Sequence, residues 1–272
     1  MSWPRCEPDP SRGLVAPRTG PGVCAICFNL ISTGQDRCRA CRAGERHIEL
    51  VVPISYSLSG GWLHTELAAY KRDADPFVPA ALQALALILE RFLTSHEGCL
   101  ANRCGLLTSR FDVATTVPSG DRRRDVAHPL RRIVGALVPS TRERYARLLA
   151  RSSAPCEKRS FDAGRFDPLR QLSGESVLLI DDLWATGASA QSAAAALRGA
   201  GASLVAAVVI GRHLNPDYRQ NEVRVGRIAG RFDWSTCVVC ADRPTSRRPE
   251  TTKPAAGQLA GGGFAELQKQ SG

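Results

Sequence analysis

Residues 177–189, with the sequence VLLIDDLWATGAS, decide the fold of this chain. An unbroken apolar run leads into two adjacent carboxylates, then into a loop of small residues and an Ala-rich segment at 188–200. A second apolar run follows at 203–210. Continuous apolar runs are typical of strands that are buried on both faces of a parallel sheet. Strand, helix and strand in such short succession predict a βαβ unit, and hence an α/β fold with helices on both faces of a parallel sheet.

The same stretch predicts a binding site for a sugar phosphate. Ligands of open α/β sheets bind outside the carboxyl ends of the strands, where Asp181 and Asp182 stand. The loop that follows meets a helix N-terminus, where free backbone N–H groups and the helix dipole favour a phosphate. The two acids would instead accept hydrogen bonds from sugar hydroxyls, or approach a metal, beside that phosphate. The candidate phosphate-binding residues are Ala185, Thr186, Gly187, Ala188 and Ser189.

Other interpretations of the stretch are weaker. It lacks the G-x-G-x-x-G of dinucleotide folds and the Gly-Lys-Ser/Thr of a P-loop. A phosphatase-type aspartyl nucleophile would also follow a strand, but no supporting lysine pattern lies downstream. Asp182 as a simple helix cap is the structural alternative. Two adjacent acids followed by Thr186-Gly187 exceed what capping needs.

Four of the ten cysteines form a C-x2-C-x10-C-x2-C pattern near the N-terminus. The N-terminal segment carries acids and prolines where a signal peptide has an apolar core, so metal ligands or reduced thiols are expected in place of disulfides. Four thiolates leave no open coordination position, which predicts a structural Zn²⁺. Redox thiols and an iron site are the alternatives. The predicted metal ligands are Cys24, Cys27, Cys38 and Cys41.

A third cysteine pair, Cys237 and Cys240, lies far along the chain. Three interpretations are open: a metal site with Cys99 and Cys104, a redox pair, or no role. The last of these is the default prediction.

The net charge of +10 is concentrated in one part of the chain. Residues 118–170 hold 13 basic and 6 acidic side chains, which favours a local anionic partner. An arginine-rich composition without functional meaning is the alternative. The longest apolar stretch, at 80–89, is too short to cross a bilayer. We therefore expect a soluble, cytoplasmic protein without membrane insertion.

Composition and periodicity divide the chain into four parts. We expect helices at 78–93, 128–138 and 141–151 and a strand at 111–117. The predicted parts are a disordered lead at 1–21, a four-cysteine zinc-knuckle at 22–46, an α/β domain at 47–240 and a disordered tail at 241–272.

Residues 177–189 closely resemble the signature of type I phosphoribosyltransferases. With the cysteine knuckles, Ala69-Tyr70-Lys71 and Val117-Pro118, the chain resembles the competence-protein F (ComF/GntX-like) family over residues 22–212. The resemblance implies a phosphoribosyltransferase-like fold that binds phosphoribosyl pyrophosphate (PRPP), or a related ribose 5-phosphate, with Mg²⁺ arriving bound to PRPP.

The resemblance also assigns roles to residues. Asp181 and Asp182 would be the catalytic pair that holds the ribose hydroxyls, and residues 185–189 would hold the 5-phosphate. The stretch 117–124 would form the pyrophosphate loop, residues within 140–165 a mobile loop, and residues 42–75 an irregular hood for the acceptor. The arginines expected to face pyrophosphate are Arg122, Arg123 and Arg124, with Arg142 and Arg144 as looser candidates.

Two classes of function follow. The first is an enzyme that transfers phosphoribose between PRPP and a nitrogen acceptor. The second is a non-catalytic ComF-type accessory in DNA uptake or nucleic-acid metabolism, or a PRPP sensor. Binding of nucleic acid by the arginines of the knuckle is disfavoured because residues 23–117 are net neutral. His128 and His213 are assigned no catalytic role.

Overall fold

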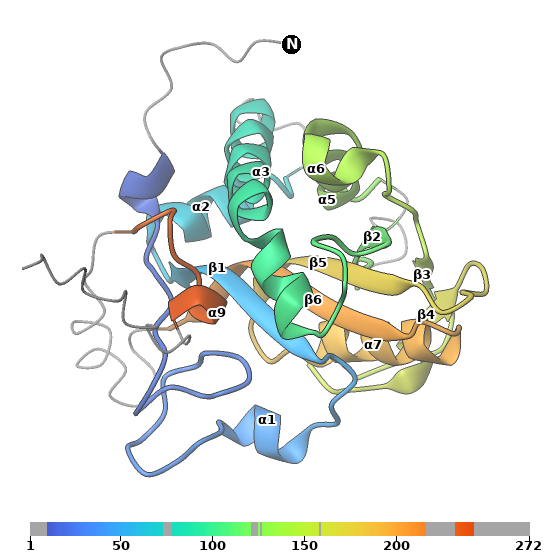
Figure 1. Ribbon diagram of the computed structural model, residues 1–272, viewed down its shortest axis with the longest axis horizontal. Coiled ribbons are helices and arrows are strands. Elements are labelled where there is room, and N and C mark those ends of the chain that lie inside the picture. The colour runs from blue at the N-terminus through green and yellow to red at the C-terminus, as the bar shows by residue number, and fades with distance from the viewer. Residues whose placement is uncertain are drawn as a thin grey trace, which may run out of the picture. The chain divides into compact units, whose positions relative to one another are not determined.

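Four parallel strands form one central sheet in the computed structural model (Figure 1). The structure describes residues 10–72, 78–120, 125, 127–157, 159–215 and 232–241, all of which lie in one compact unit, residues 1–242. The strand order is β1-β6-β5-β2. The strands are β1 (Leu50–Leu58), β2 (Val113–Thr116), β5 (Ser176–Trp184) and β6 (Leu204–Leu214). The predicted α/β class with a helix-flanked parallel sheet is confirmed.

Alternate residues of β5 face opposite cores, because successive side chains of a strand point to opposite faces. Leu178 and Ile180 pack into the core beneath the longest helix, whereas Val177 and Leu179 pack into the other core. Both faces are therefore apolar, as the continuous run in the sequence requires.

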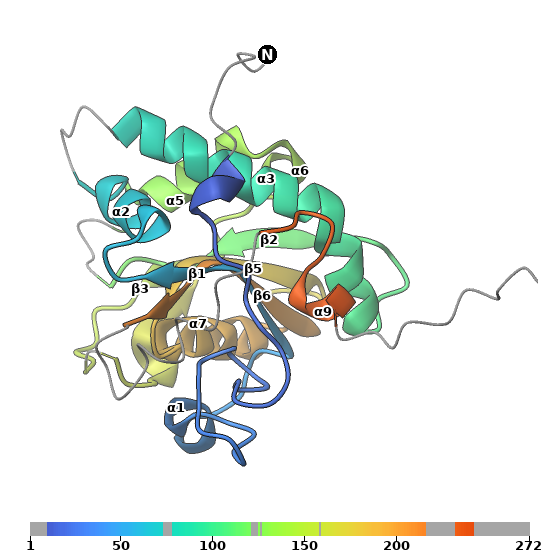
Figure 2. The same ribbon diagram turned by 90° about the vertical axis from the view of Figure 1, so that its left-hand side faces the viewer.

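Helices cover both faces of the sheet (Figure 2). One face carries the long helix α3 and several short helices, and the other carries α7, the knuckle with α1, and the antiparallel pair β3–β4. The elements of the first face are α2 (Trp62–Ala69), α3 (Val78–Arg103), α5 (Pro129–Arg132), a π-helical turn η2 (Ile133–Leu137), α6 (Pro139–Arg142) and α9 (Val238–Ala241). Those of the second are α1 (Arg39–Ala43), β3 (Leu149–Arg151), β4 (Phe166–Pro168) and α7 (Ala188–Gly199). Two single turns remain, η1 (Pro10–Gly13) and η3 (Ala163–Arg165).

Three predicted elements extend further than expected. The strand predicted from the apolar run before Asp181 continues to Trp184 because β6 pairs with it along its whole length, so Asp181 and Asp182 lie on the strand. The predicted helix at 78–93 continues to Arg103. The predicted strand at 203–210 runs to Leu214.

Two expectations about local structure are wrong. The predicted helix at 141–151 ends at Arg142, and residues 149–151 form β3, because the backbone of Ala114 bonds with Arg144 and Ala146 and draws the chain along β2. Residues 50–58, expected within an irregular hood, form β1 of the main sheet. Pro53 obscured this strand in the sequence, but β1 is an edge strand, where a missing N–H is tolerated.

Residues 10–21 of the predicted disordered lead are described. Leu14 is buried, and Val15 pairs with Tyr56 of β1. Residues 1–9 and 242–272, which include nearly all of the predicted tail, lie outside the described residues. Among the described helices, none has the length and apolar character needed to cross a bilayer.

Candidate functional site

A cavity of about 430 Å³ lies at the carboxyl ends of β2 and β5. The two strands are neighbours, with Thr116 opposite Ile180, so the segments that follow them meet. The cavity thus brings together three parts of the chain that are distant in sequence. It is lined by Lys71, Val117, Pro118, Ser119, Gly120, Ala127, His128, Pro129, Asp181, Asp182, Leu183 and Ser189.

Asp182 is the buried carboxylate of the pair, with 6% of its surface exposed. Lys71 Nζ lies 2.5 Å from its Oδ2, and the Tyr70 hydroxyl donates to the same oxygen. Burial alone would raise the pKa of Asp182, but the charge of Lys71 and these hydrogen bonds outweigh it and lower the pKa. Asp182 is therefore an anion that holds Lys71 at the edge of the cavity.

Asp181 has different surroundings although it is adjacent in sequence. It is partly exposed to the cavity, and its Oδ1 accepts a hydrogen bond of 3.0 Å from the backbone N–H of Asp182. Burial and the negative charge of Asp182 raise its pKa to about 8, against the opposing effect of Lys71. A carboxyl group that is costly to ionise at neutral pH is typical of functional sites. A ligand cation or hydroxyl group beside Asp181 would relieve this cost.

Gly187 sets the loop between β5 and α7. It is the N-cap residue of α7 and has a φ of 84°, which favours glycine. A Cβ atom there would lie 2.1 Å from the Trp184 ring, so the loop backbone passes directly over the indole. The first-turn N–H groups of α7, with the Thr186 and Ser189 hydroxyls, form the predicted phosphate-binding end of the helix.

A second hollow, of about 450 Å³, lies on the other side of this loop. Thr186, Gly187 and Ala188 line it together with Cys41 and Arg46 from the knuckle region. Phe161, which also lines this hollow, stacks on His47 with the ring centroids 5.2 Å apart. The loop is thus shared by two cavities of similar size.

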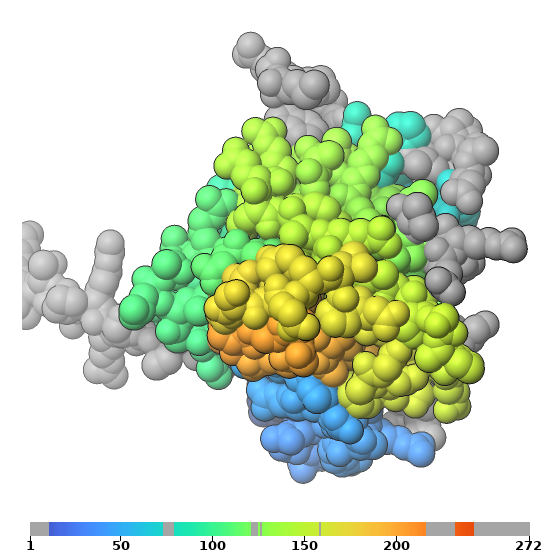
Figure 3. Space-filling model, turned by 90° about the vertical axis from the view of Figure 1, so that its right-hand side faces the viewer, coloured from blue at the N-terminus to red at the C-terminus, as the bar shows by residue number. Residues whose placement is uncertain are grey.

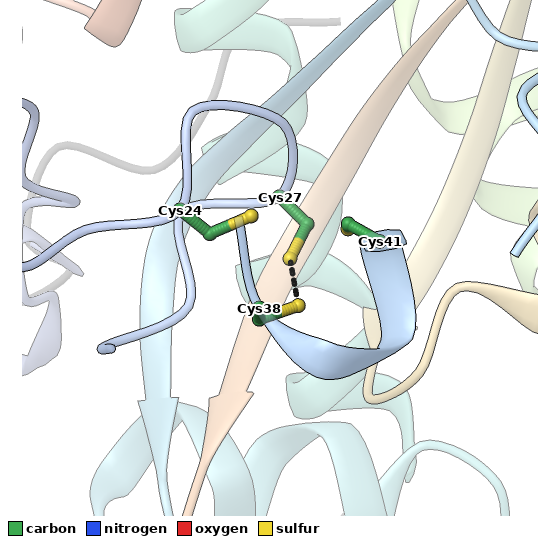
Figure 4. A group of neighbouring side chains, drawn as sticks. All are labelled: Cys24, Cys27, Cys38 and Cys41. Atoms are coloured by element: carbon green, nitrogen blue, oxygen red, sulfur yellow. Dashed lines mark hydrogen bonds between the residues drawn. The ribbon is translucent and has the colours of Figure 1, made fainter. Parts of the chain in front are cut away.

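The four predicted metal ligands converge in space (Figure 4). Their sulfur atoms all lie within 4.8 Å of one another, and Cys27 Sγ is 3.7 Å from Cys38 Sγ. Tetrahedral zinc with Zn–S bonds of about 2.3 Å needs sulfur atoms about 3.8 Å apart. The cluster is therefore compatible with a structural zinc ion.

Arg212 joins this cluster to the end of β5. Its buried guanidinium donates to the carbonyl oxygens of Cys27, at 2.8 Å, and Trp184, at 2.9 Å. Its Nη2 also lies 3.8 Å from Cys27 Sγ. A buried cation is costly unless negative charge lies close to it, and a metal-bound set of four thiolates carries net negative charge.

Asp125 fixes the loop that follows β2. Its buried carboxylate accepts from the Ser119 backbone N–H at 3.2 Å, from Arg131 at 2.6 Å and from Arg147 at 3.1 Å. Ser119 and Gly120 are thereby held at the mouth of the cavity, with the Ser119 N–H engaged by Asp125. His128, the N-cap residue of α5, lies beside them, and burial lowers its pKa.

The structure supports neither of the looser arginine assignments to pyrophosphate, and the other three arginines are not described. Arg122, Arg123 and Arg124 lie outside the described residues. Arg144 is engaged away from the cavity, with its guanidinium 2.6 Å from Glu97 and bonded to the Phe111 carbonyl, so its looser assignment to pyrophosphate is wrong. Arg142 is exposed on α6 and does not line the cavity.

Much of the basic charge of residues 118–170 is likewise engaged within the fold. Several of its arginines bond to carboxylates or to backbone carbonyls, namely Arg131, Arg144, Arg147, Arg151, Arg165 and Arg170. Figure 3 shows part of this stretch, coloured yellow-green to yellow, beside α7 (orange) and the knuckle region (blue). Fewer of these guanidinium groups are therefore available to contact an anionic partner than their number in the sequence suggests.

Sequence reasoning missed that Lys71 and His128 line the cavity and that Tyr70 bonds to Asp182. Tyr70-Lys71 follows α2 directly, and only its quotation within the family resemblance drew attention to it. His128 was assigned no role because a lone histidine carries no pattern. Neither a family model nor a curated protein sequence matches this chain.

Proposed function

We propose that this protein binds PRPP with Mg²⁺ and transfers its phosphoribosyl group to a nitrogen acceptor, as its resemblance to type I phosphoribosyltransferases of the ComF type suggests. The observation that supports this most is the composition of one cavity. It places the Asp181–Asp182 pair, the Lys71 ammonium and the loop after β2 beside the N-terminus of α7. The ribose hydroxyls and both phosphate-bearing ends of PRPP would each have a matching group in this cavity.

Each part of PRPP has a matching group. The 5-phosphate would lie at the first turn of α7, where Ser189 lines the cavity. The ribose hydroxyls would donate to Asp181, the acid that is open to the cavity. The pyrophosphate would face Lys71 and the loop 117–120, which Asp125 holds in place.

The oxygen-rich surroundings of the cavity also suit Mg²⁺. This ion prefers oxygen ligands and is commonly held by one or two carboxylates together with the phosphates of a substrate. Asp181 supplies such a carboxylate at the point where the ribose hydroxyls and the pyrophosphate meet. Bound Mg²⁺ would supply positive charge to the departing pyrophosphate.

The transfer breaks the bond between the anomeric carbon and a pyrophosphate oxygen, and the electron pair leaves with pyrophosphate. The acceptor nitrogen forms the new bond to this carbon and releases a proton. Lys71 stabilises the developing negative charge. His128, kept neutral by burial, lines the same cavity and would accept the proton.

The segment between β3 and β4 would cover the phosphate-binding loop from the side of the second hollow, which its Arg159, Ser160 and Phe161 line. Near the two ends of this segment, Ser152 Oγ donates to the Gly164 carbonyl at 2.6 Å. Closure of such a segment excludes water from a reactive carbon centre.

Calorimetric titration with PRPP and Mg²⁺ tests the binding step. The unaltered protein is expected to show saturable binding that Asp181→Asn/Asp182→Asn abolishes. Asp36→Asn/Asp167→Asn removes the same charge at exposed positions and should bind normally. Asp181→Asn alone is a second test should the double variant unfold, because the ion pair with Lys71 is made by Asp182.

Turnover separates the enzyme from the alternatives. Release of pyrophosphate with a panel of nitrogen acceptors should fall in His128→Gln while PRPP affinity is retained. Binding without turnover for any acceptor would favour a PRPP sensor. No binding by the folded protein would overturn the proposal and favour a non-catalytic accessory with a macromolecular partner.

A further inference from the structure

A second group of metal-ligating side chains lies on the opposite face of the sheet from the knuckle, and the proposed function does not use it. His96 and Cys99 come from α3, Cys237 directly precedes α9, and Cys240 lies in α9. One ligand atom from each lies within 4.8 Å of the others. The sequence offered Cys104 as a fourth ligand, but the structure brings His96 into the group and leaves Cys104 out.

The spacing within each half suits a shared ion. His96 and Cys99 are three residues apart on one helix and therefore share a face of α3. Cys237 and Cys240 have the C-x2-C spacing that binds a single metal ion in structural zinc sites. The two halves meet because α9 packs its apolar side into the core beneath α3, with Val238 and Val239 buried.

The ligand atoms converge closely enough to share one metal ion, with the sulfur atoms somewhat nearer to one another than in tetrahedral zinc. Cys240 Sγ lies 3.1 Å from Cys99 Sγ, 3.4 Å from Cys237 Sγ and 3.5 Å from His96 Nδ1. Cys99 Sγ lies 3.9 Å from the same nitrogen. Bonds of about 2.3 Å to sulfur and about 2.0 Å to nitrogen imply separations of about 3.8 Å between sulfurs and about 3.6 Å between sulfur and nitrogen.

The histidine is oriented as a metal ligand. Its Nε2 donates to the Trp234 carbonyl at 2.9 Å, which fixes the proton on Nε2 and turns the lone pair of Nδ1 toward the three sulfurs. A backbone carbonyl bonded to the remote nitrogen is the usual support of a metal-bound histidine. The ring also lies against Phe92, with centroids 5.1 Å apart, so its orientation is fixed before a metal binds.

We propose that His96, Cys99, Cys237 and Cys240 bind a second structural zinc ion that fastens the segment 232–241 to α3. A closed set of one imidazole and three thiolates leaves no position for substrate, so the role is structural. The site lies apart from the carboxylate cavity and shares none of its lining residues. The ion would act as a crosslink between parts of the chain separated by more than a hundred residues, and such links contribute directly to folding free energy.

Metal content of the full chain tests the proposal. Protein purified in reducing buffer without chelator should release two zinc ions per chain when its thiols are titrated with a mercurial reagent. Cys237→Ser/Cys240→Ser should retain one, as should Cys24→Ser/Cys27→Ser. Cys104→Ser, a change next to α3 but outside the group, should retain two.

X-ray absorption distinguishes the two sites by their ligands. The zinc that remains in Cys24→Ser/Cys27→Ser should show three sulfur ligands and one nitrogen, whereas that in Cys237→Ser/Cys240→Ser should show sulfur alone. Hydrogen exchange in residues 232–241 should rise in the latter variant and not in Cys104→Ser.

Two results would overturn the proposal, and both can be obtained from the unaltered chain. One is release of a single zinc ion with only sulfur ligands. The other is a disulfide between Cys99 and Cys240, or between Cys237 and Cys240, in the reduced preparation, which mass spectrometry detects.

Discussion

The two hollows that flank the loop between β5 and α7 are of similar size, at about 430 and 450 Å³, but differ in chemistry. The first contains the Asp181–Asp182 pair and Lys71, so charge dominates it. The second is bounded by the knuckle region and the Trp184 indole, with Glu45, Arg46 and Arg159 also in its lining. Trp184 lies against Gly187 on this side, so the loop has its charged partners on one side and its packing contact on the other.

The difference predicts how substitutions on the two sides will act. Changes behind the loop, at Arg212 or Gly187, should reduce stability and binding together because they displace the backbone. A change at Asp181, the acid that is open to the carboxylate cavity, should reduce binding while leaving stability unchanged or improved, since its charge is held at a cost to the fold.

Arg212→Met should give the largest effect on the supporting side. It leaves the buried carbonyls of Cys27 and Trp184 without their donors, at a total cost of about 3 kcal/mol in the free energy of unfolding. Zinc affinity of the knuckle should fall as well, because the guanidinium lies against Cys27 Sγ. Urea unfolding and zinc competition with a chelator measure the two effects.

Arg170→Met is the matched control for Arg212→Met. Arg170 pairs with Glu175 at 2.8 Å on the surface, where solvent screens the two charges, so its loss should leave the free energy of unfolding nearly unchanged. Equal effects of the two substitutions would refute the bridging role of Arg212.

Gly187→Ala should come next in size. The added Cβ is incompatible with both the φ of 84° and the Trp184 ring, which costs about 1–3 kcal/mol and moves the loop. PRPP affinity should fall about tenfold for each 1.4 kcal/mol lost in binding. Thermal unfolding and calorimetry on the same preparation measure both quantities.

Gly199→Ala provides the comparison within the same helix. A Cβ at the exposed end of α7 meets nothing within 4 Å, so this variant should gain about 0.5–1 kcal/mol and bind PRPP normally. If Gly187→Ala behaved in the same way, the loop would not depend on Trp184 for its position.

Features contained in one short stretch could be predicted from the sequence, whereas those formed by residues far apart in the chain could not. The β5–α7 unit and the Cys24–Cys41 cluster are each contained in a short stretch, so spacing and apolar runs were sufficient to find them. Strand β1 was not predicted because proline, here Pro53, is unusual within strands. The position of β1 at the edge of the sheet explains why proline is tolerated there.

The placement of Lys71 and Asp125 depends on contacts that no spacing encodes. Lys71 reaches Asp182 across 111 residues, and Asp125 gathers Ser119, Arg131 and Arg147 through side-chain geometry alone. The same holds for His96 and Cys99, whose partners lie at the other end of the described chain. Arginine composition was misleading for a related reason, because a count of charges does not reveal which of them pair within the fold.

Asp181→Asn should change stability in the opposite direction to Arg212→Met and Gly187→Ala, as a gain. The pKa of Asp181 is raised from 3.8 to about 8 in the folded protein, so between these values the folded state holds a proton that the unfolded chain has lost. Stability contributed by this proton is present at low pH and is lost as pH rises toward about 8.

The amide of Asp181→Asn keeps the hydrogen-bonding capacity without the charge. The variant should therefore unfold at a higher temperature than the unaltered protein at pH 8, with the difference shrinking toward pH 4. Thermal unfolding across this range measures it, at about 2–4 °C for each kcal/mol. Asp36→Asn, at a side chain that is 79% exposed, should show no such trend. PRPP binding should be weakened in Asp181→Asn at every pH. If the variant lost binding without gaining stability at pH 8, the Asp181 carboxylate would be stabilised by a partner within the fold, and its charge would not be held at a cost for the sake of the ligand.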